Sequence, residues 1–173
     1  MNVEVRNVGL DELNMLMEWR MRVLREVFAD VWRDADEGAI RTNNEAYYRE
    51  HLSDGTHTAA FALDSDSGRI VGCGGICYQD EMPSPDNLSG TCGYLMNVFA
   101  LPELRGKGIG RMIVEFLVAD ATMRGTGKVY LESSKVAKVL YREMGFVDLP
   151  DYMKLPGRIR PRRETQRDRK SVV

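Results

Sequence analysis

The sequence predicts a mixed α/β domain, and three observations carry that prediction. Residues 97–123 change from an apolar, strand-like run to a helical repeat across three alternating glycines. Residues 13–28 place apolar side chains at three- and four-residue intervals, which is typical of a helix with one buried face. Short apolar runs separated by turn residues are typical of strands, and they occur at 58–63, 69–78 and 92–100.

Composition places the chain among ordinary globular proteins. Its 173 residues suffice for one domain with a hydrophobic core, and its hydrophobic content of 43% and charged content of 29% are typical of that class. The net charge of −2 conceals an asymmetry, because residues 156–173 carry +5 and the rest of the chain carries −7. We therefore expect a single domain over residues 1–155 and a basic, disordered tail over 156–173.

Several classes of function are excluded at this stage. No apolar run is long enough to span a membrane and no signal peptide is present, so we expect a cytoplasmic protein without a membrane partner. Cys73, Cys77 and Cys92 are expected to be free thiols rather than a disulfide or metal site. The chain has only two histidines, so we expect no metal. An acidic body without a basic stripe gives no reason to expect a nucleic-acid partner.

The elements follow in order. A first strand is expected to about residue 8, then a helix over 11–28, and then a second helix from an Asn43 cap to about residue 52. The polar loop 79–90 is a candidate for substrate contact. Helices over 110–124 and 135–144 flank a strand over 128–132, and residues 146–155 are expected to hold a closing strand interrupted at Pro150.

The glycine-rich turn predicts a phosphate site. Its sequence is Arg105-Gly106-Lys107-Gly108-Ile109-Gly110-Arg111. The glycines let backbone N–H groups approach a ligand, and the start of the following helix favours an anion. The spacing fits neither a P-loop nor a dinucleotide fingerprint.

Two motifs resemble those of the GCN5-related N-acetyltransferases (the GNAT family). The turn resembles the family signature Arg/Gln-x-x-Gly-x-Gly/Ala. The string Leu140-Tyr141-Arg142-Glu143-Met144-Gly145-Phe146 resembles the family's Leu-Tyr-x-x-x-Gly-Phe element. The resemblance covers residues 55–155, and residues 1–54 only in general layout. It implies a central, mostly antiparallel sheet with two parallel strands that splay apart, flanked by helices.

The resemblance also implies acetyl-CoA as the donor. Its pantetheine arm would lie between the strands at 94–100 and 129–132 and pair with the backbone of Val98, Phe99 and Ala100. Its pyrophosphate would lie on the turn, from Arg105 and Gly106 through Lys107, Gly108, Ile109 and Gly110 to Arg111. Ser134 lies where some relatives contact the cofactor.

Tyr141 is the expected general acid. A phenol with a pKa of about 10 can donate a proton to a departing thiolate at neutral pH. The alternative is that Tyr141 packs on the cofactor as an aromatic wall.

The general base is left open. The central strand offers no carboxylate, and Glu132 matches a glutamate that some ribosomal-protein acetyltransferases use. A glutamate would need burial or a water chain to accept an ammonium proton, and Glu132 alternatively caps the next helix.

The expected function is acetyl transfer to the primary amine of a small cationic or zwitterionic molecule, or of a peptide N-terminus. Acidic residues at 30–54 and 80–86 would attract a cationic acceptor. The alternative is a non-catalytic acyl-CoA-binding sensor or scaffold. A homodimer is possible on family grounds.

Overall fold

The computed structural model describes residues 2–155, and the expected tail at 156–173 lies outside them. Five strands form one sheet in the order β1-β2-β3-β4-β5. The strands are β1 (Val3–Val8), β2 (His57–Asp64), β3 (Ile70–Asp80), β4 (Thr91–Ala100) and β5 (Lys128–Leu131). The helices are α1 (Leu13–Val27), α2 (Ala29–Trp32), α3 (Glu37–Ser53), α4 (Ile109–Met123) and α5 (Lys138–Glu143).

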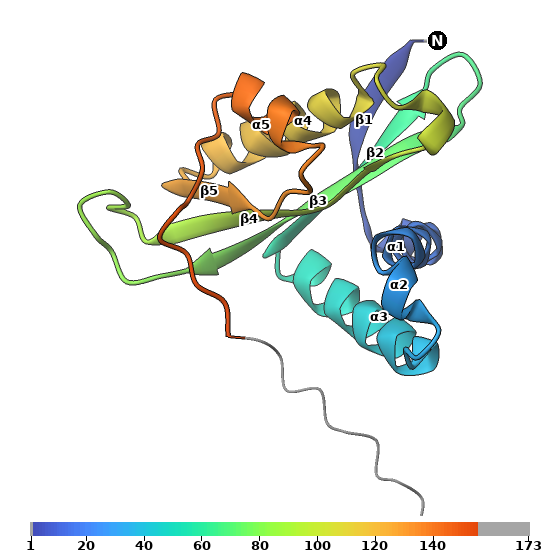
Figure 1. Ribbon diagram of the computed structural model, residues 1–173, viewed down its shortest axis with the longest axis horizontal. Coiled ribbons are helices and arrows are strands. Elements are labelled where there is room, and N and C mark those ends of the chain that lie inside the picture. Colours follow the sequence, from blue (N-terminus) through green and yellow to red (C-terminus); the bar gives the residue numbers. More distant parts are fainter. Residues whose placement is uncertain (1, 156–173) are drawn as a thin grey trace, which may run out of the picture.

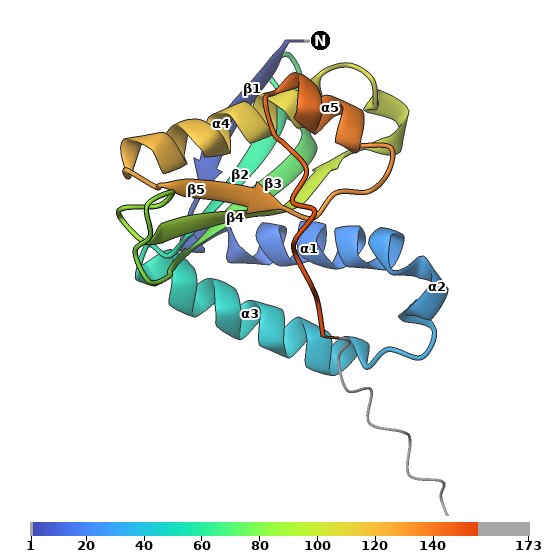
Figure 2. The same ribbon diagram turned by 60° about the vertical axis from the view of Figure 1, so that its left-hand side comes forward.

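The sheet separates two helical layers. Helices α1 and α3 cover one face, and α4 with α5 covers the other (Figures 1 and 2). The core divides accordingly into one cluster around Trp19 and Phe99 and another around Ile113 and Leu117. Helices α1 and α4 therefore each bury one apolar stripe against the sheet, which for α1 the helical spacing predicted.

The predicted mixed class and sheet are confirmed. The pairs β1–β2, β2–β3 and β3–β4 are antiparallel, and β4–β5 is parallel. Strand β5 pairs with β4 only at Cys92–Leu95, so residues 96–100 of β4 continue beyond their β5 partner. The resemblance implied two parallel strands that splay apart; the structure shows that β5 ends at Leu131, so this side of β4 has no β5 partner at residues 96–100.

A β-bulge interrupts β4 where β5 ends. Gly75 pairs with Met96 and Cys73 pairs with Phe99, so β4 has one more residue than β3 across this interval. Asn97 has a φ of 59°, which is the left-handed region that a bulge residue can adopt. Side chains alternate between the two faces of a sheet along a strand, so one extra residue reverses which faces the following side chains occupy. Leu95 and Val98 therefore face α4, whereas Asn97 and Phe99 face α1.

Two expected boundaries are wrong. Helix α3 begins at Glu37 instead of near residue 43, because the Asp36 carboxylate accepts a hydrogen bond from the Ala39 N–H at 3.0 Å and caps the helix there. Asn43 lies inside that helix. The last helix is also shorter than expected, since α5 begins at Lys138.

The expected closing strand at 146–155 is absent. Asp148 binds Lys138 at 3.2 Å and Arg142 at 2.5 Å, so the start of this segment is held against α5. Pro150 lacks the N–H group that a strand ladder needs. The segment instead crosses β5, where the rings of Tyr152 and Tyr130 lie 6.1 Å apart (Figure 2).

Three further expectations concerned membrane-spanning helices, metal sites and the cysteines. Within residues 2–155, no helix has the length and apolar character needed to cross a bilayer. The same residues contain no cluster of His, Cys, Asp and Glu side chains suited to a metal ion. Cys73, Cys77 and Cys92 are free thiols, as expected.

Candidate functional site

The first feature of the site is an open strand edge. One edge of β4 pairs with β3 through Phe99 and Ala100. Beyond Leu95, the opposite edge has no partner strand in the described part of the chain. The peptide groups of residues 98–100, which we expected to bind the pantetheine, thus belong to the part of β4 that extends beyond β5. Such an edge can pair with an extended ligand as it would with another strand.

The glycine turn ends at the N-terminus of α4. Gly106 and Gly108 have φ angles of 78° and 81°, and Gly108 is the N-cap residue of α4. No atom lies within 4 Å of an ideal Cβ at either glycine. These glycines therefore serve the left-handed backbone and an open approach rather than internal packing. The N–H groups of the first turn have no intrahelical acceptor and can bind an anion.

The basic residues of the turn differ in their surroundings. Arg105 forms an ion pair with Glu26 and its guanidinium lies 5.4 Å from the centre of the Phe99 ring. Arg111 pairs with Glu143 at 2.6 Å. Lys107 is exposed and has no ion-pair partner among the described residues. An anion arriving at the turn therefore meets Lys107 without a competing protein carboxylate.

The turn and the Tyr141 motif are neighbours in the structure. The Arg111–Glu143 ion pair joins α4 to α5, and a Cβ on Gly110 would lie 3.7 Å from the Leu140 side chain. Ile109 and Tyr141 belong to the same apolar cluster. The fold thus brings together two motifs that are separate in sequence.

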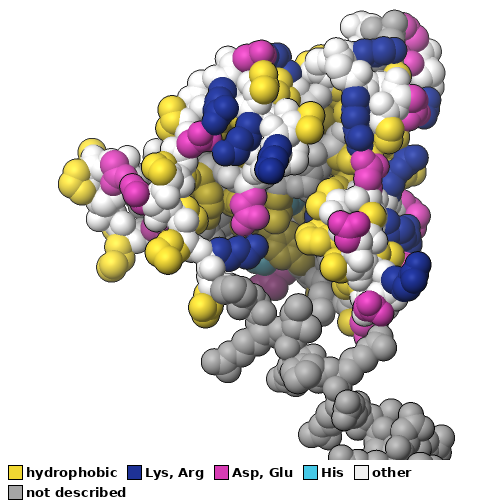
Figure 3. Space-filling model, viewed as in Figure 1, with side chains coloured by type: hydrophobic (Ala, Val, Ile, Leu, Met, Phe, Trp, Pro, Cys, Tyr) yellow, Lys and Arg dark blue, Asp and Glu magenta, His cyan; other side chains and the backbone are white. Residues whose placement is uncertain are grey.

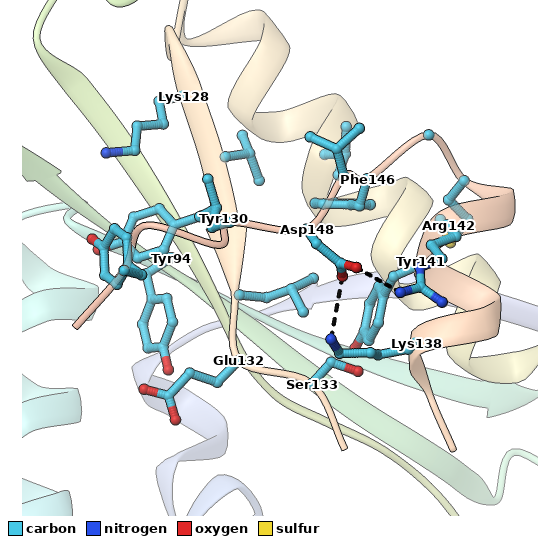
Figure 4. A pocket seen from close by; sticks show the side chains of 18 residues that line it. Tyr94, Lys128, Tyr130, Glu132, Ser133, Lys138, Tyr141, Arg142, Phe146 and Asp148 are labelled. Atoms are coloured by element: carbon cyan, nitrogen blue, oxygen red, sulfur yellow. Dashed lines mark hydrogen bonds and ion pairs between the residues drawn. The ribbon is translucent and has the colours of Figure 1, made fainter. Parts of the chain in front are cut away.

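A cavity of about 740 Å³ lies beside β5, with α5 on one side and residues 146–152 across it (Figure 4). The space-filling view shows a hollow with hydrophobic side chains at its floor (Figure 3). Tyr141 lines the cavity, and its ring packs edge-on against Phe146 with 5.7 Å between centroids. Burial raises the pKa of Tyr141 above its ordinary value. A raised pKa keeps the phenol protonated, as a proton donor requires.

Glu132 and Ser134 lie less deeply. Glu132 lines the cavity but its side chain is 74% exposed, and Lys154 lies 3.9 Å from its carboxylate. It therefore lacks the burial that we expected a carboxylate base to need. The Ser134 hydroxyl accepts a hydrogen bond from the Ala137 N–H at 3.3 Å, and the Ser134 carbonyl accepts one from the Lys138 N–H at 3.2 Å. Ser134, rather than Glu132, caps the turn that leads into α5.

The motif search missed two tyrosines of the cavity. Tyr94 on β4 and Tyr130 on β5 are directly paired in register, and their ring centroids lie 5.1 Å apart. Burial, followed by the nearby carboxylate of Glu132, raises the pKa of Tyr94 (Figure 4). The sequence shows one tyrosine in each of the two strands. It does not show that the two tyrosines are paired, because the register between β4 and β5 cannot be read from the sequence.

A second pocket, of about 220 Å³, lies on the α1 and α3 side of the sheet. It is lined by Arg20, Asn43, Asn44, Tyr47, Tyr48 and Met96. The sequence analysis assigned none of these residues to a site. Arg20 was visible as a charged residue between Met17 and Met21 in the apolar stripe of α1, and that interruption is the signal we did not use.

The acidic residues that we expected at the acceptor mouth are largely committed elsewhere. Asp36 caps α3, Glu37 pairs with Arg25, and Glu45 pairs with Arg49 at 2.7 Å. In the loop before β4, Glu81 pairs with Lys128 at 3.1 Å. Neither pocket is lined by any of the acidic residues from the two expected stretches.

The sequence comparisons agree on one family. Residues 13–146 match the model of the acetyltransferase (GNAT) family. The uncharacterized N-acetyltransferase YjgM of Escherichia coli K12 is 30% identical over 130 residues, which are 72% of each chain. The IAA acetyltransferase of Azospirillum brasilense is 32% identical over 93 residues, covering 51% of this chain and 54% of the relative.

Solved structures show the same fold. A predicted acetyltransferase from Clostridium acetobutylicum, crystallised with acetyl-CoA, superposes with a TM-score of 0.78 at 23% identity, covering 90% of this chain and 96% of that one. A GCN5-related N-acetyltransferase from Ralstonia eutropha JMP134 gives a TM-score of 0.74 at 22% identity, covering 90% and 99%. The sheet and its flanking helices are therefore an arrangement that other acetyltransferase structures share.

Proposed function

Because the chain belongs to the GNAT family of acetyltransferases, we propose that it transfers an acetyl group from acetyl-CoA to a primary amine. The acceptor amine belongs to a small zwitterionic or cationic molecule or to a peptide N-terminus. The family is one of acyltransferase enzymes, which favours an enzyme over a non-catalytic acyl-CoA-binding module. Attack by the amine on the thioester is direct, without an acyl-enzyme.

The open edge of β4 is the observation that carries the proposal. Peptide groups at 98–100 would pair with the amides of the pantetheine arm, because no strand competes for that edge among the described residues. The arm would then lead to the turn at Gly106 and Gly108, where the N-terminus of α4 and Lys107 suit the pyrophosphate. The residues present thus fit the donor by backbone geometry and by charge.

Tyr141 is the proton donor in this proposal. Acetyl-CoA supplies an activated acyl group, and a departing thiolate is stabilised by receiving a proton. Burial keeps the Tyr141 phenol protonated in the ground state. In the described part of the chain its hydroxyl makes no hydrogen bond, so it remains available to a ligand in the cavity.

The acceptor amine must lose a proton before it attacks. Glu132 lies on the cavity rim beside Tyr94, where a carboxylate can receive that proton through water (Figure 4). Its exposure favours the role of a relay to solvent over that of a buried base. The pH dependence of kcat/KM for a Glu132→Gln variant separates these two roles.

A thiol-release assay tests the proposal. The protein is incubated with acetyl-CoA and a panel of amino acids, amino sugars, polyamines and short peptides, and free CoA is measured. We expect amine-dependent release of CoA and formation of the N-acetyl product. Tight binding of acetyl-CoA in calorimetry without turnover of any amine would contradict the proposal.

A further inference from the structure

Arg20 occupies an unusual position for an arginine. It lies on the buried side of α1, between Met17 and Met21, which are 3% and 0% exposed. Its own side chain is partly buried and lines the 220 Å³ pocket. Partial removal of a guanidinium from water is unfavourable unless its N–H groups find acceptors.

The acceptors that the protein provides are neutral. Arg20 Nε donates to Asn44 Oδ1 at 2.8 Å, and Arg20 Nη1 donates to Asn97 Oδ1 at 2.9 Å. Both amides are held in place, because Asn44 Nδ2 donates to the Ile40 carbonyl at 2.8 Å and Asn97 belongs to the β4 bulge. These bonds orient the guanidinium while its remaining N–H groups stay available.

The absence of a carboxylate distinguishes Arg20 from most other arginines of the described residues. Nine of those arginines form an ion pair with a carboxylate: Arg6, Arg25, Arg41, Arg49, Arg69, Arg105, Arg111, Arg124 and Arg142. Arg20, Arg22 and Arg33 do not, and of these three only Arg20 is partly buried. The fold thus withdraws one guanidinium partly from water, oriented by neutral groups and without a counter-ion from residues 2–155.

The charge of Arg20 acts on its neighbours. It lowers the pKa of Tyr48 and of Cys73, although burial is the larger effect and raises both to about 12. Burial, then the charges of His51 and Arg20, lowers the pKa of His57 to about 4, so this imidazole is neutral and contributes no second positive charge at pH 7. Arg20 is consequently the dominant cation on this wall of the pocket.

The pocket adjoins the part of β4 that extends beyond the end of β5. Met96 lines it, and the bulge residue Asn97, which contacts Arg20, directly precedes Val98 on the open edge. An acceptor in this pocket would approach the donor from the α1 and α3 side of the sheet. The guanidinium is therefore placed to bind one end of an acceptor while its amine faces the thioester.

We propose that Arg20 binds an anionic group of the acceptor, a carboxylate or a phosphate, and that the acceptor is a small amine carrying such a group. This inference rests on the proposed acetyl transfer and narrows it to zwitterionic acceptors. A guanidinium binds carboxylate and phosphate oxygens with paired, charge-assisted hydrogen bonds. The asparagine amides that hold Arg20 preorganise it for this contact.

Matched acceptors and matched variants test the inference. One acceptor pair is an amino acid and its amide, and a second pair is glucosamine 6-phosphate and glucosamine. These pairs separate a carboxylate from a phosphate and each anion from its neutral counterpart. The variants are Arg20→Gln and Arg20→Lys, with Arg22→Gln as the control because Arg22 is an exposed arginine on the same helix.

We expect the parent to favour the anionic member of one pair. Arg20→Gln should lower kcat/KM for that acceptor by about 10- to 100-fold, chiefly through KM, and change the neutral member by less than about threefold. Arg20→Lys should lie between, and Arg22→Gln should resemble the parent. Unchanged far-UV circular dichroism and acetyl-CoA affinity would exclude a folding defect.

The failures are distinguishable. Equal losses on charged and neutral acceptors, or a parent that prefers the neutral members, would overturn the role of Arg20 while leaving acetyl transfer intact. If the parent acetylates nothing in the panel, acetyl transfer itself fails for these amines. The Nε–Hε resonance of Arg20 in ¹⁵N NMR then decides, because it must shift with the amino acid or the phosphate and not with the neutral partners. A resonance that shifts with neither anion overturns the inference.

Discussion

The donor and acceptor sides of this protein are built in different ways. The proposed donor side binds its ligand mainly through backbone: the open edge at 98–100, the left-handed glycines of the turn and the first turn of α4. The proposed acceptor side consists of side chains from three separate elements, with Arg20 on α1, Asn44 on α3 and Asn97 on β4.

This difference explains how the two sides can vary. A backbone site depends on φ angles and strand pairing, so it tolerates many side chains but few backbone changes. A side-chain site is altered by a single substitution without changing the fold. A family can therefore keep one donor while individual members change acceptor. The side chains of the acceptor side are the ones that we expect to set the acceptor specificity of this chain.

Removal of the Tyr141 hydroxyl should give the largest effect on the donor side. We expect Tyr141→Phe to lower kcat by roughly 100-fold with acetyl-CoA affinity nearly unchanged, because the ring still packs on Phe146 while the proton donor is lost. Steady-state kinetics and calorimetry measure the two quantities. Tyr152→Phe is the control, since Tyr152 is 60% exposed. A Tyr141→Phe enzyme with parental kcat would leave the tyrosine as a wall of the cavity.

On the acceptor side we expect stability to depend on pH through His57. Its pKa is lowered to about 4 by burial and by the charges of His51 and Arg20, whereas its ordinary value is 6.5. The unfolded chain therefore binds a proton that the folded chain excludes. The contribution of neutral His57 to the free energy of unfolding is fully present above about pH 6.5 and is lost as the pH falls toward 4. The free energy of unfolding should therefore fall by about 2 kcal/mol between pH 7 and pH 5.

Urea unfolding at both pH values measures this loss. His57→Gln should remove most of the dependence, while His51→Gln, at a partly exposed histidine, should not. A parental free energy of unfolding that is constant between pH 7 and pH 5 would show that His57 is protonated in the folded protein.

Gly108 tests whether the donor side depends on backbone conformation. We expect Gly108→Val to raise the KM for acetyl-CoA more than tenfold, because the left-handed φ of 81° disfavours a β-branched residue and the new side chain points into the open approach. Gly125→Val is a matched control, since Gly125 has a φ of 72°, equally open surroundings and a place at the other end of α4.

Both variants should lose similar stability, about 1–2 kcal/mol. Only Gly108→Val should lose acetyl-CoA affinity. An equal loss of affinity in both would mean that strain in α4, rather than obstruction of a phosphate, is responsible.

Removal of residues 156–173 should have the smallest effect. These residues are polar and basic without a periodic apolar face, and we assign them to neither side of the site. Truncation after Leu155 should leave the melting temperature nearly unchanged and the turnover of a small amine within about twofold of the parent. A large loss of acceptor turnover alone would assign the tail to the acceptor side.

The sequence by itself determined the features that are local in the chain. The turn from Arg105 to Arg111 could be assigned because glycine spacing, positive φ and a helix start are properties of adjacent residues. Tyr141 was identified by its own short motif, and the order of the five strands and of α1, α3, α4 and α5 followed from apolar spacing, although the same reasoning added a closing strand at 146–155 that the structure lacks. Each of these depends on interactions within a few residues.

Only the tertiary structure decided the features that depend on register and on long-range contact. The bulge at Asn97 reverses which residues of β4 face α1, and a shift of one residue leaves almost no trace in composition. The path of residues 146–155 depends on the ion pairs of Asp148 with Lys138 and Arg142, and the exposure of Glu132 is likewise a property of the packed chain. Arg20 meets Asn97 across a separation of 77 residues, so only the packed chain reveals that pair as part of a site.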